Sequence, residues 1–280
     1  MIVPLKKDHV LLGDINTTDR LRTQLHLWWL GQSGYLMQYG NRRLLLDPYL
    51  SDSLTKKYAN SDKPHTRISE LVIDPGHLSG IDVATSSHNH TDHLDAETLL
   101  PLMVRNPNME LLIPEANRVF VADRLKCEPG FPTGLNDRES IELGGFIFHG
   151  IPAAHNELER DASGRCKYMG YVVQIGPFTI YHSGDTLLFP GMVELLKPFN
   201  IDLALLPING NLPERRVAGN LDGKEAAWLA KEIGARLVIP CHYDLFAFNT
   251  ADPAAFAAAA TALHQPFRIL QIGERLSFEF

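Results

Sequence analysis

Residues 87–93 carry the strongest chemical signal in the sequence, because three histidines and an aspartate fall within six positions there. Neutral imidazole and carboxylate groups are good ligands for divalent metal ions. His88 and His90 are two residues apart, so in an extended segment both rings point to the same side and can bind one ion. Asp92 and His93 follow around a corner and can hold a second ion. The alternative, a solvated histidine-rich loop, is disfavoured because the segment directly follows an apolar, strand-like run.

Three later segments offer the remaining ligands of a metal cage. His155 follows an apolar run, Asp185 lies in the sequence SGDT, and His242 lies in the sequence PCHY. Each comes where a predicted strand meets a loop, which is where sheet proteins gather ligands from distant parts of the chain. Gly184, next to Asp185, would allow a close backbone approach. Each residue alone could be structural, but together with residues 87–93 they predict metal ligation.

The elements that must position these residues form two blocks, each a β-meander followed by βα units. Strands are predicted at 24–29, 35–39, 43–46, 81–86, 110–113, 140–143, 146–151, 168–175, 178–182, 203–207 and 236–240, with a final pair at 267–271 and 275–280. Helices are predicted at 94–104, 115–125, 191–196, 223–233 and 253–264. This order predicts an α/β fold with two sheets packed face to face and helices outside, an αββα four-layer sandwich. We expect residues 1–280 to form a single domain, because no linker-like segment interrupts them.

Composition narrows the function further. The chain has 280 residues, 45% of them hydrophobic, and a net charge of −7 from 26 basic and 33 acidic residues. This balance argues against a protein that coats nucleic acid or an anionic membrane. No run approaches the ~20 apolar residues of a membrane-spanning helix, and Lys6 and Lys7 stand where a signal peptide would need apolar residues. We therefore expect a cytoplasmic protein with no membrane partner.

The motif order HxHxDH, His, Asp in SGDT, and His resembles the metallo-β-lactamase superfamily, from about Trp28 to the C-terminus. Asp47 in the sequence LLDP fits the first motif of that superfamily. The resemblance implies two metal ions and one bridging carboxylate. In this sequence the first ion would be held by His88, His90 and His155, the second by Asp92, His93 and His242, with Asp185 between them.

Within the superfamily, four motifs are similar to the L-ascorbate-6-phosphate lactonase group. They are WWLG at 28–31, HTDHLD at 90–95, YHSGD at 181–185 and VIPCHYD at 238–244. This resemblance implies hydrolysis of a small polar lactone or ester, with a phosphorylated sugar lactone as one candidate. It also favours Mn²⁺ as the working metal, with Zn²⁺ next.

The residues themselves indicate the mechanism. Two cations lower the pKa of a bound water to about 7 and polarise the attacked bond, so a metal-bound hydroxide can serve as nucleophile. Asp92 is the candidate catalytic residue, because its carboxylate can orient that hydroxide and accept its proton. A serine nucleophile is disfavoured, because no serine has a histidine–carboxylate pair outside the predicted cage. Without a thiolate ligand the set suits Zn²⁺, Mn²⁺ or Fe²⁺, and Cys241 is expected to be a buried apolar residue.

Candidate substrate or supporting contacts have equally simple structural alternatives. His182 would orient Asp185 or be an ordinary buried histidine, and Asn209 and Asn211 would line the site or form a turn. Arg165 and Lys167 would bind a phosphate or be solvated surface charges. The remaining candidates are Asp47, Tyr243 and Asp244.

The leading functional hypothesis is a two-metal hydrolase of a small-molecule substrate. A phosphodiesterase or nuclease of the same fold is the first alternative, although such enzymes need basic surfaces for nucleic acid that this chain does not supply. A metal-binding sensor without turnover is the second, and it predicts a damaged ligand set. Self-association as a homo-oligomer is compatible with the sequence.

Overall fold

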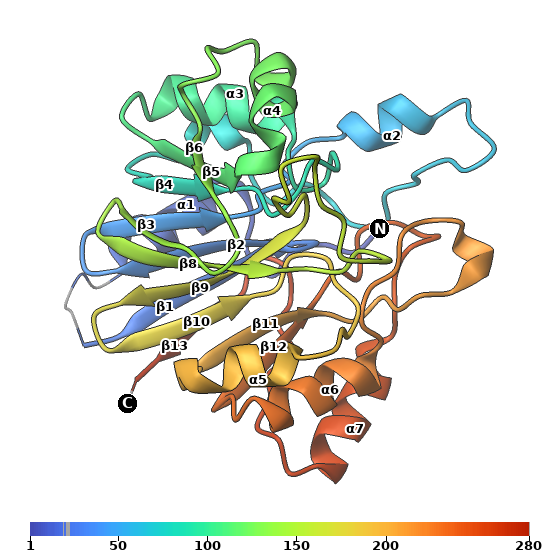
Figure 1. Cartoon of the computed structure of the whole chain (residues 1–280). Coiled ribbons are helices and arrows are strands. Elements are labelled where there is room, and N and C mark those ends of the chain that lie inside the picture. Colours follow the sequence, from blue (N-terminus) through green and yellow to red (C-terminus); the bar gives the residue numbers. More distant parts are fainter. Residues whose placement is uncertain (19, 21–22, 280) are drawn as a thin grey trace.

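Two β-sheets face each other at the centre of the molecule, with helices on both outer sides (Figure 1). The structure is a computed structural model that describes residues 1–18, 20 and 23–279. The predicted α/β fold with an αββα arrangement is confirmed.

The first sheet has seven strands in the order β13-β1-β2-β3-β4-β5-β6. An antiparallel meander, β1 to β3, is followed by parallel strands β4 to β6. Their bounds are β1 Leu25–Gly31, β2 Gly34–Tyr39, β3 Arg42–Leu46, β4 Val83–Thr85, β5 Glu110–Pro114, β6 Thr133–Leu135 and β13 Arg275–Phe278. All seven residues of β1 are buried, as expected of a strand covered on both faces.

The second sheet repeats this plan in six strands, ordered β12-β11-β10-β9-β8-β7. Strands β7 to β10 are antiparallel, and β10 to β12 run parallel. Their bounds are β7 Ser140–Leu143, β8 Phe146–Pro152, β9 Met169–Ile175, β10 Phe178–His182, β11 Leu203–Pro207 and β12 Leu237–Cys241. Positive φ angles at Gly144, Gly145 and Gly176 form the two hairpin turns that the sequence predicts.

Seven α-helices lie in the part of the chain that the structure describes. They are α1 Asp8–Thr17, α2 Ser53–Tyr58, α3 Ala96–Arg105, α4 Arg118–Leu125, α5 Met192–Leu196, α6 Gly223–Glu232 and α7 Pro253–Ala262. In Figure 1, α3 and α4 lie outside the first sheet, whereas α5, α6 and α7 lie outside the second. Among these described helices none is long and apolar enough to cross a lipid bilayer.

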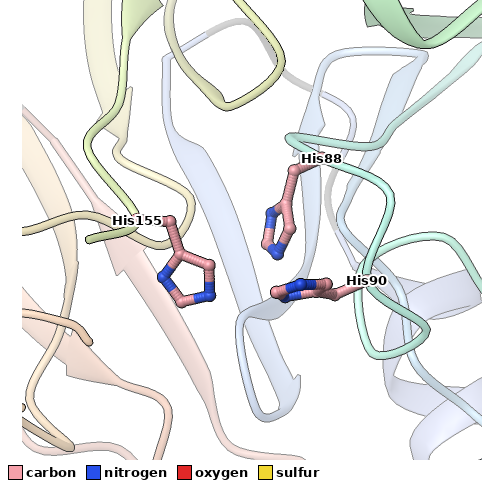
Figure 2. A group of neighbouring side chains, drawn as sticks. All are labelled: His88, His90 and His155. Carbon is pink, nitrogen blue, oxygen red and sulfur yellow. The ribbon is translucent and has the colours of Figure 1, made fainter. Parts of the chain in front are cut away.

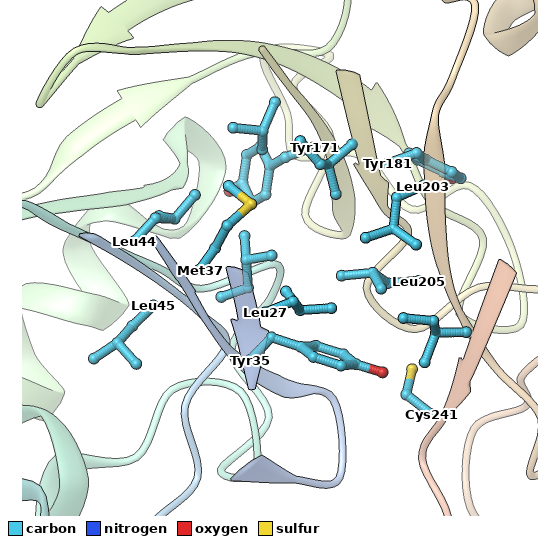
Figure 3. Close-up of a cluster of buried hydrophobic side chains, with 14 of the residues drawn as sticks. Leu27, Tyr35, Met37, Leu44, Leu45, Tyr171, Tyr181, Leu203, Leu205 and Cys241 are labelled. Atoms are coloured by element: carbon cyan, nitrogen blue, oxygen red, sulfur yellow. The ribbon is translucent and has the colours of Figure 1, made fainter. Parts of the chain in front are cut away.

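The space between the sheets is filled by apolar side chains from both (Figure 3). Leu27 and Met37 from the first sheet meet Tyr171 and Leu205 from the second, and each of these is almost completely buried. One hydrophobic cluster extends from Leu11 to Ile272 and draws on both sheets. Cys241 is buried in it, as the sequence predicts.

The structure corrects the prediction at the C-terminal end. The strands predicted at 267–271 and 275–280 do not pair with each other. Instead β13 crosses to the first sheet and pairs antiparallel with β1, Leu27 facing Leu276. Phe267 makes only a bridge to Val238. Residue 280 lies outside the described residues.

Candidate metal centre

The loops that follow β3, β4, β8, β10 and β12 converge at one edge of the two sheets. These loops carry Asp47, residues 87–93, His155, Asp185 and His242. Backbone hydrogen bonds connect loops of the two sheets at this edge. The His242 N–H donates to the Gln32 carbonyl at 3.0 Å, and the Met169 N–H donates to the Ser87 carbonyl at 3.0 Å.

Three histidines form one corner of the site. His88, His90 and His155 each offer a nitrogen, and these nitrogens all lie within 4.8 Å of one another. Figure 2 shows the three rings turned toward a common point. The ring centroids are 4.6 Å apart for His88 and His90, and 5.0 Å apart for His90 and His155. This is a spacing that one metal ion can fill.

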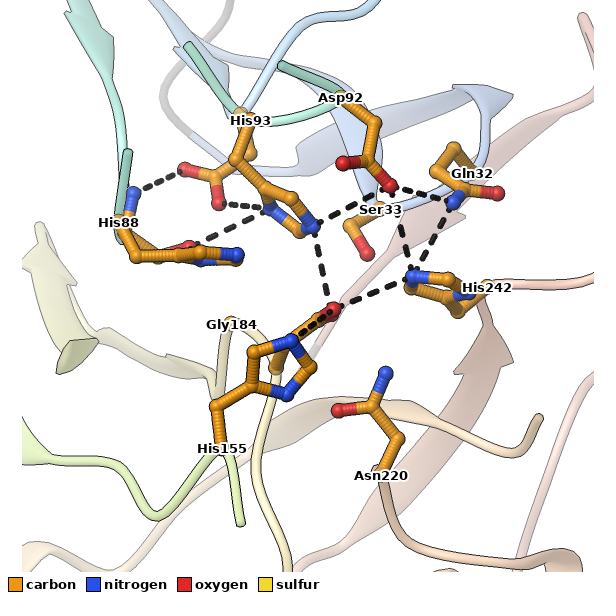
Figure 4. Close-up of polar contacts among 12 residues, drawn as sticks. Gln32, Ser33, His88, Asp92, His93, His155, Gly184, Asn220 and His242 are labelled. Atoms are coloured by element: carbon orange, nitrogen blue, oxygen red, sulfur yellow. Dashed lines mark hydrogen bonds and ion pairs between the residues drawn. The ribbon is translucent and has the colours of Figure 1, made fainter. Parts of the chain in front are cut away.

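A second group lies beside the first (Figure 4). Asp92, His93 and His242 again offer ligand atoms within 4.8 Å of one another, and so do His88, His93 and Asp185. Asp185 lies between the groups, because its Oδ1 is 3.3 Å from His93 Nε2 and its Oδ2 is 3.2 Å from His242 Nε2. The same Oδ2 is 3.7 Å from His155 Nε2. All seven residues predicted as metal ligands are thus brought together.

The ionisation of these residues suits a cation. Burial lowers the pKa of His88 well below its ordinary value and that of His155 to about 4, so both rings are neutral at pH 7, the form that can bind a metal ion. Burial would raise the pKa of Asp185, but His242 and His93 more than offset it, and the pKa lies well below its usual range. Burial would lower the pKa of His93, yet Asp185 and Asp92 raise it well above 6.5. The two carboxylates therefore favour positive charge between them.

Hydrogen bonds on the far side of the rings fix the histidines. His93 Nδ1 lies 2.7 Å from Asp47 Oδ2, and His155 Nδ1 lies 2.9 Å from the Gly219 carbonyl. Asp47 is itself held, because its Oδ1 accepts hydrogen bonds from Thr85 Oγ1 and the Ser87 N–H. A second-layer partner of this kind sets which nitrogen faces a metal. Asp47 thus supports a ligand and does not line the pocket above the site.

Several buried polar atoms at the centre have no hydrogen-bond partner among the described residues. They are His88 Nε2, His93 Nε2 and Asp185 Oδ1. His93 Nε2 and Asp185 Oδ1 are an ion pair 3.3 Å apart, whereas a buried polar atom with no partner at all, such as His88 Nε2, costs about 1–3 kcal/mol. Metal ions between these atoms would satisfy all of them, and the donor set therefore fits divalent cations.

The backbone conformation lets the ligand-bearing loops approach one another closely. A Cβ on Gly184 would lie 2.6 Å from Ser87 Cβ, so only glycine allows the Asp185 loop to approach the histidine loop. Gln32, Asp47 and His242 have φ angles of 51°, 39° and 63°, in the left-handed region that non-glycine residues rarely adopt. Such strain gathers at functional sites.

Gln32 is a site residue that the sequence motifs do not reveal. It is fully buried, and its Nε2 donates to Asp92 Oδ2 at 2.8 Å and lies 3.0 Å from His242 Nε2 (Figure 4). Its carbonyl also accepts the Trp29 indole N–H at 3.0 Å. Only the glycines at 31 and 34 hint from the sequence at the tight turn that places this amide.

The site opens into a pocket of about 550 Å³. His90, Asp92, His155, Asp185 and His242 line its floor. Of the Asp92 and Asp185 carboxylates, that of Asp92 is the more exposed, with 15% of the side chain accessible to solvent against 4% for Asp185.

Most of the predicted substrate contacts lie elsewhere. Arg165 pairs with Asp161 at 2.7 Å, and Lys167 pairs with Glu159, because the loop after His155 folds back on itself. His182 does not hydrogen-bond to Asp185; its Nε2 lies 2.9 Å from the Ser33 carbonyl. Arg165 and Lys167 thus have the surface ion pairs, and His182 the ordinary buried position, that the sequence left open as alternatives.

The remaining candidates are also outside the pocket wall. The Tyr243 hydroxyl donates to the Leu270 carbonyl at 3.0 Å, and its ring packs on Trp29. Asn209 is buried between Asn249 and Asn220, while Asn211 is exposed. Asp244 is half-buried, and its backbone N–H donates to Thr250 Oγ1.

Comparison with known proteins now gives the family. Residues 26–242 match the model of the beta-lactamase superfamily domain. A UPF0173 metal-dependent hydrolase of Pelotomaculum thermopropionicum is 31% identical over 256 residues, covering 89% of this chain and 97% of the relative. The chain belongs to the UPF0173 metal-dependent hydrolases of the beta-lactamase superfamily. The predicted superfamily is confirmed, and the similarity to the lactonase group stays a prediction.

Two other comparisons agree with this family. A UPF0173 metal-dependent hydrolase of Methanosarcina mazei is 28% identical over 242 residues, covering 85% of this chain and 91% of the relative. The crystal structure of the metallo-beta-lactamase fold protein YhfI from Bacillus subtilis superposes with a TM-score of 0.64 at 19% identity, covering 91% of this chain and all of that one. The fold of this UPF0173 chain is therefore that of a metallo-β-lactamase.

Proposed function

We propose that this protein is a two-metal hydrolase that opens a small ester or lactone. The observation that carries the proposal is the set of three overlapping ligand groups, His88–His90–His155, His88–His93–Asp185 and Asp92–His93–His242. Members of each group line one pocket, namely His90, Asp92, His155, Asp185 and His242. In this proposal His88, His90 and His155 hold one ion, Asp92, His93 and His242 hold the other, and Asp185 is shared. The metals would be Mn²⁺ or Zn²⁺, with Fe²⁺ as a further candidate.

The bound ions would supply a nucleophilic hydroxide near pH 7 and polarise the carbonyl that it attacks. The protein's own part is to arrange groups around that carbonyl. Asp92 faces the pocket, and Gln32 occupies its Oδ2 as a hydrogen-bond donor. Oδ1 of Asp92 is then the oxygen that accepts the proton of the attacking water and returns it to the leaving alcohol.

A phosphorylated substrate is disfavoured, because Arg165 and Lys167, the predicted phosphate-binding residues, form ion pairs away from the pocket. We therefore favour an uncharged ester or lactone. We also propose that residues 1–280 act as one domain on a small-molecule substrate in the cytoplasm, without nucleic acid or membrane and compatible with a homo-oligomer.

The test begins with metal-free protein that is reconstituted separately with Mn²⁺ and Zn²⁺. Acid release is measured from γ-butyrolactone and phenyl acetate, with bis(p-nitrophenyl) phosphate as the phosphodiester comparison. We expect metal-dependent hydrolysis of a carbonyl substrate that Asp92→Ala reduces at least 100-fold. His149→Ala is the control, because His149 hydrogen-bonds Gln174 on the second sheet and does not line the pocket.

Cleavage of the phosphodiester alone would replace the ester proposal by the phosphodiesterase alternative. Full metal binding without any turnover would favour a sensor.

A further inference from the structure

Four ring side chains form one wall of the pocket above the candidate metal centre. This aromatic wall consists of Tyr58, His65, Phe246 and Phe248. His65 stacks on Tyr58 with ring centroids 4.2 Å apart and meets Phe248 edge-on at 4.6 Å. Phe246 lies 5.4 Å from His65. These contacts are typical of aromatic clusters that hold a fixed shape.

The wall is tied to the metal ligands along the chain and in space. Phe246 and Phe248 follow His242 in the same loop, and all three line the same pocket. Phe246 also joins Tyr49, Leu54 and Leu245 in a small hydrophobic cluster that is separate from the main core. The main core therefore does not account for this cluster, whereas a place beside the floor of the pocket does.

Three members of the wall are partly exposed. Tyr58, His65 and Phe248 are half-buried, so each keeps ring surface that a ligand can cover. Burial lowers the pKa of His65, and its ring is therefore neutral at pH 7. Apolar and aromatic surface with a few polar groups is the usual lining of a small-molecule site.

Most of the basic side chains that line the pocket already bind other groups of the protein. Arg216 pairs with Asp62 at 2.8 Å, and Lys63 Nζ donates to the Arg216 carbonyl. Arg124 donates to the carbonyls of Asn89 and Leu94 and packs over the Phe120 ring at 4.4 Å. Lys57 remains, exposed at the mouth and 5.1 Å from the Tyr58 ring centre. This arrangement offers little for a multiply charged phosphate.

We propose that the aromatic wall binds a planar apolar group of the substrate, so that the preferred substrates are esters or lactones with an aryl substituent and not polar sugar lactones. This inference rests on the proposed hydrolase function. It names the substrate class from the wall and leaves the metal ligands in the roles already given.

The test uses two lactones with the same reactive ring, γ-phenyl-γ-butyrolactone and γ-hydroxymethyl-γ-butyrolactone. In the reconstituted protein we expect kcat/KM to be at least tenfold higher for the phenyl lactone. Phe248→Ala should lower that ratio about tenfold, mainly by raising KM for the phenyl lactone, and Phe248→Leu should fall between. Phe131→Ala is the control, because Phe131 is a similarly exposed ring outside the pocket.

A binding measurement separates this inference from the hydrolase proposal. Calorimetric titration with 4-phenylbutanoate and with butanoate should give tighter binding of the phenyl compound, by about tenfold, in wild type but not in Phe248→Ala. That result without turnover of any ester would support the wall and overturn the hydrolase proposal. A ratio of kcat/KM that is near one, or that Phe248→Ala leaves unchanged, would overturn the wall and keep the hydrolase.

Discussion

Carboxylates on both sides of the His93 ring orient it and attract a cation to it. Its ring is completely buried between Asp47 on one nitrogen and Asp92 and Asp185 near the other. The carboxylate behind the ring makes the imidazole a better ligand, and the carboxylates in front attract a cation. These four residues come from three different loops, so the geometry of the site depends on the hydrogen bonds between the loops.

Removing the shared carboxylate should have the largest effect of any single change. Asp185→Asn keeps the shape but loses the charge that lies near His93, His155 and His242. We expect loss of at least one metal ion per chain and at least 100-fold lower turnover. Elemental analysis after dialysis gives the metal content. Asp202→Asn is the matched control, since Asp202 is a buried aspartate that pairs with Arg236 away from the site, and retention of all metal by Asp185→Asn would remove the bridging role.

The amide of Gln32 should matter for metal affinity without being needed for folding. Its Nε2 fixes Asp92 and lies against His242, so Gln32→Ala frees both side chains. Loss of such a supporting contact typically weakens metal binding 10–100-fold. Competition against a chromophoric chelator measures this affinity, and Gln271→Ala, at an exposed position, provides the baseline. An unchanged affinity would make the Gln32 contact incidental.

Elements place these residues by bringing strand ends to one edge of two sheets. Hydrogen bonds between distant parts of the chain hold these elements in place. One large hydrogen-bond network surrounds Arg43 on β3. Its guanidinium donates to the Ile15 carbonyl of α1, the Ser79 carbonyl and the Gln38 side chain. Arg43 thereby anchors the N-terminal helix to the outside of the first sheet.

Arg43→Met should therefore cost stability. The substitution removes the donor of the hydrogen bonds to the Ile15 and Ser79 carbonyls and to Gln38 Oε1, and the loss of these bonds corresponds to about 2–3 kcal/mol of unfolding free energy. Urea denaturation of the metal-free protein measures the change. Arg42→Met is the control, because Arg42 is exposed and makes a surface pair with Asp82, worth about 0–1 kcal/mol. Equal effects of the two substitutions would contradict the anchoring role.

The candidate ligands could be predicted from the sequence where they lie close together in one short segment. The spacing of His88, His90, Asp92 and His93 is preserved in any chain that turns after β4, so their proximity was predictable. Gln32 was not, because its role comes from a left-handed turn and from contacts with residues 60 and 210 positions away. The pairing of β13 with β1 was missed for a similar reason, since nothing near Arg275 specifies a partner at the other end of the chain.

At the scale of the whole molecule, the Asp92 and Asp185 carboxylates and several buried imidazoles lie where loops from both sheets meet. Metal ions bound there would stabilise the folded state only, because the ligands come together only on folding. We expect a chelator to lower Tm by roughly 5–15 °C for ions held at about 100 times their Kd. Calorimetry before and after adding back Mn²⁺ or Zn²⁺ measures this shift. An unchanged Tm after verified metal removal would count against both ion positions.

The pairing of β13 with β1 also bears on how the protein is made. Strand β1 is completely buried, and its outer neighbour is β13, Arg275–Phe278, which is translated long after β1. Until those residues emerge from the ribosome, β1 is the unpaired edge of a six-stranded sheet, which is a surface that invites association with other chains. A nascent chain of this protein should therefore need protection by chaperones until β13 has been translated, which is after the loops of the candidate metal centre have been made.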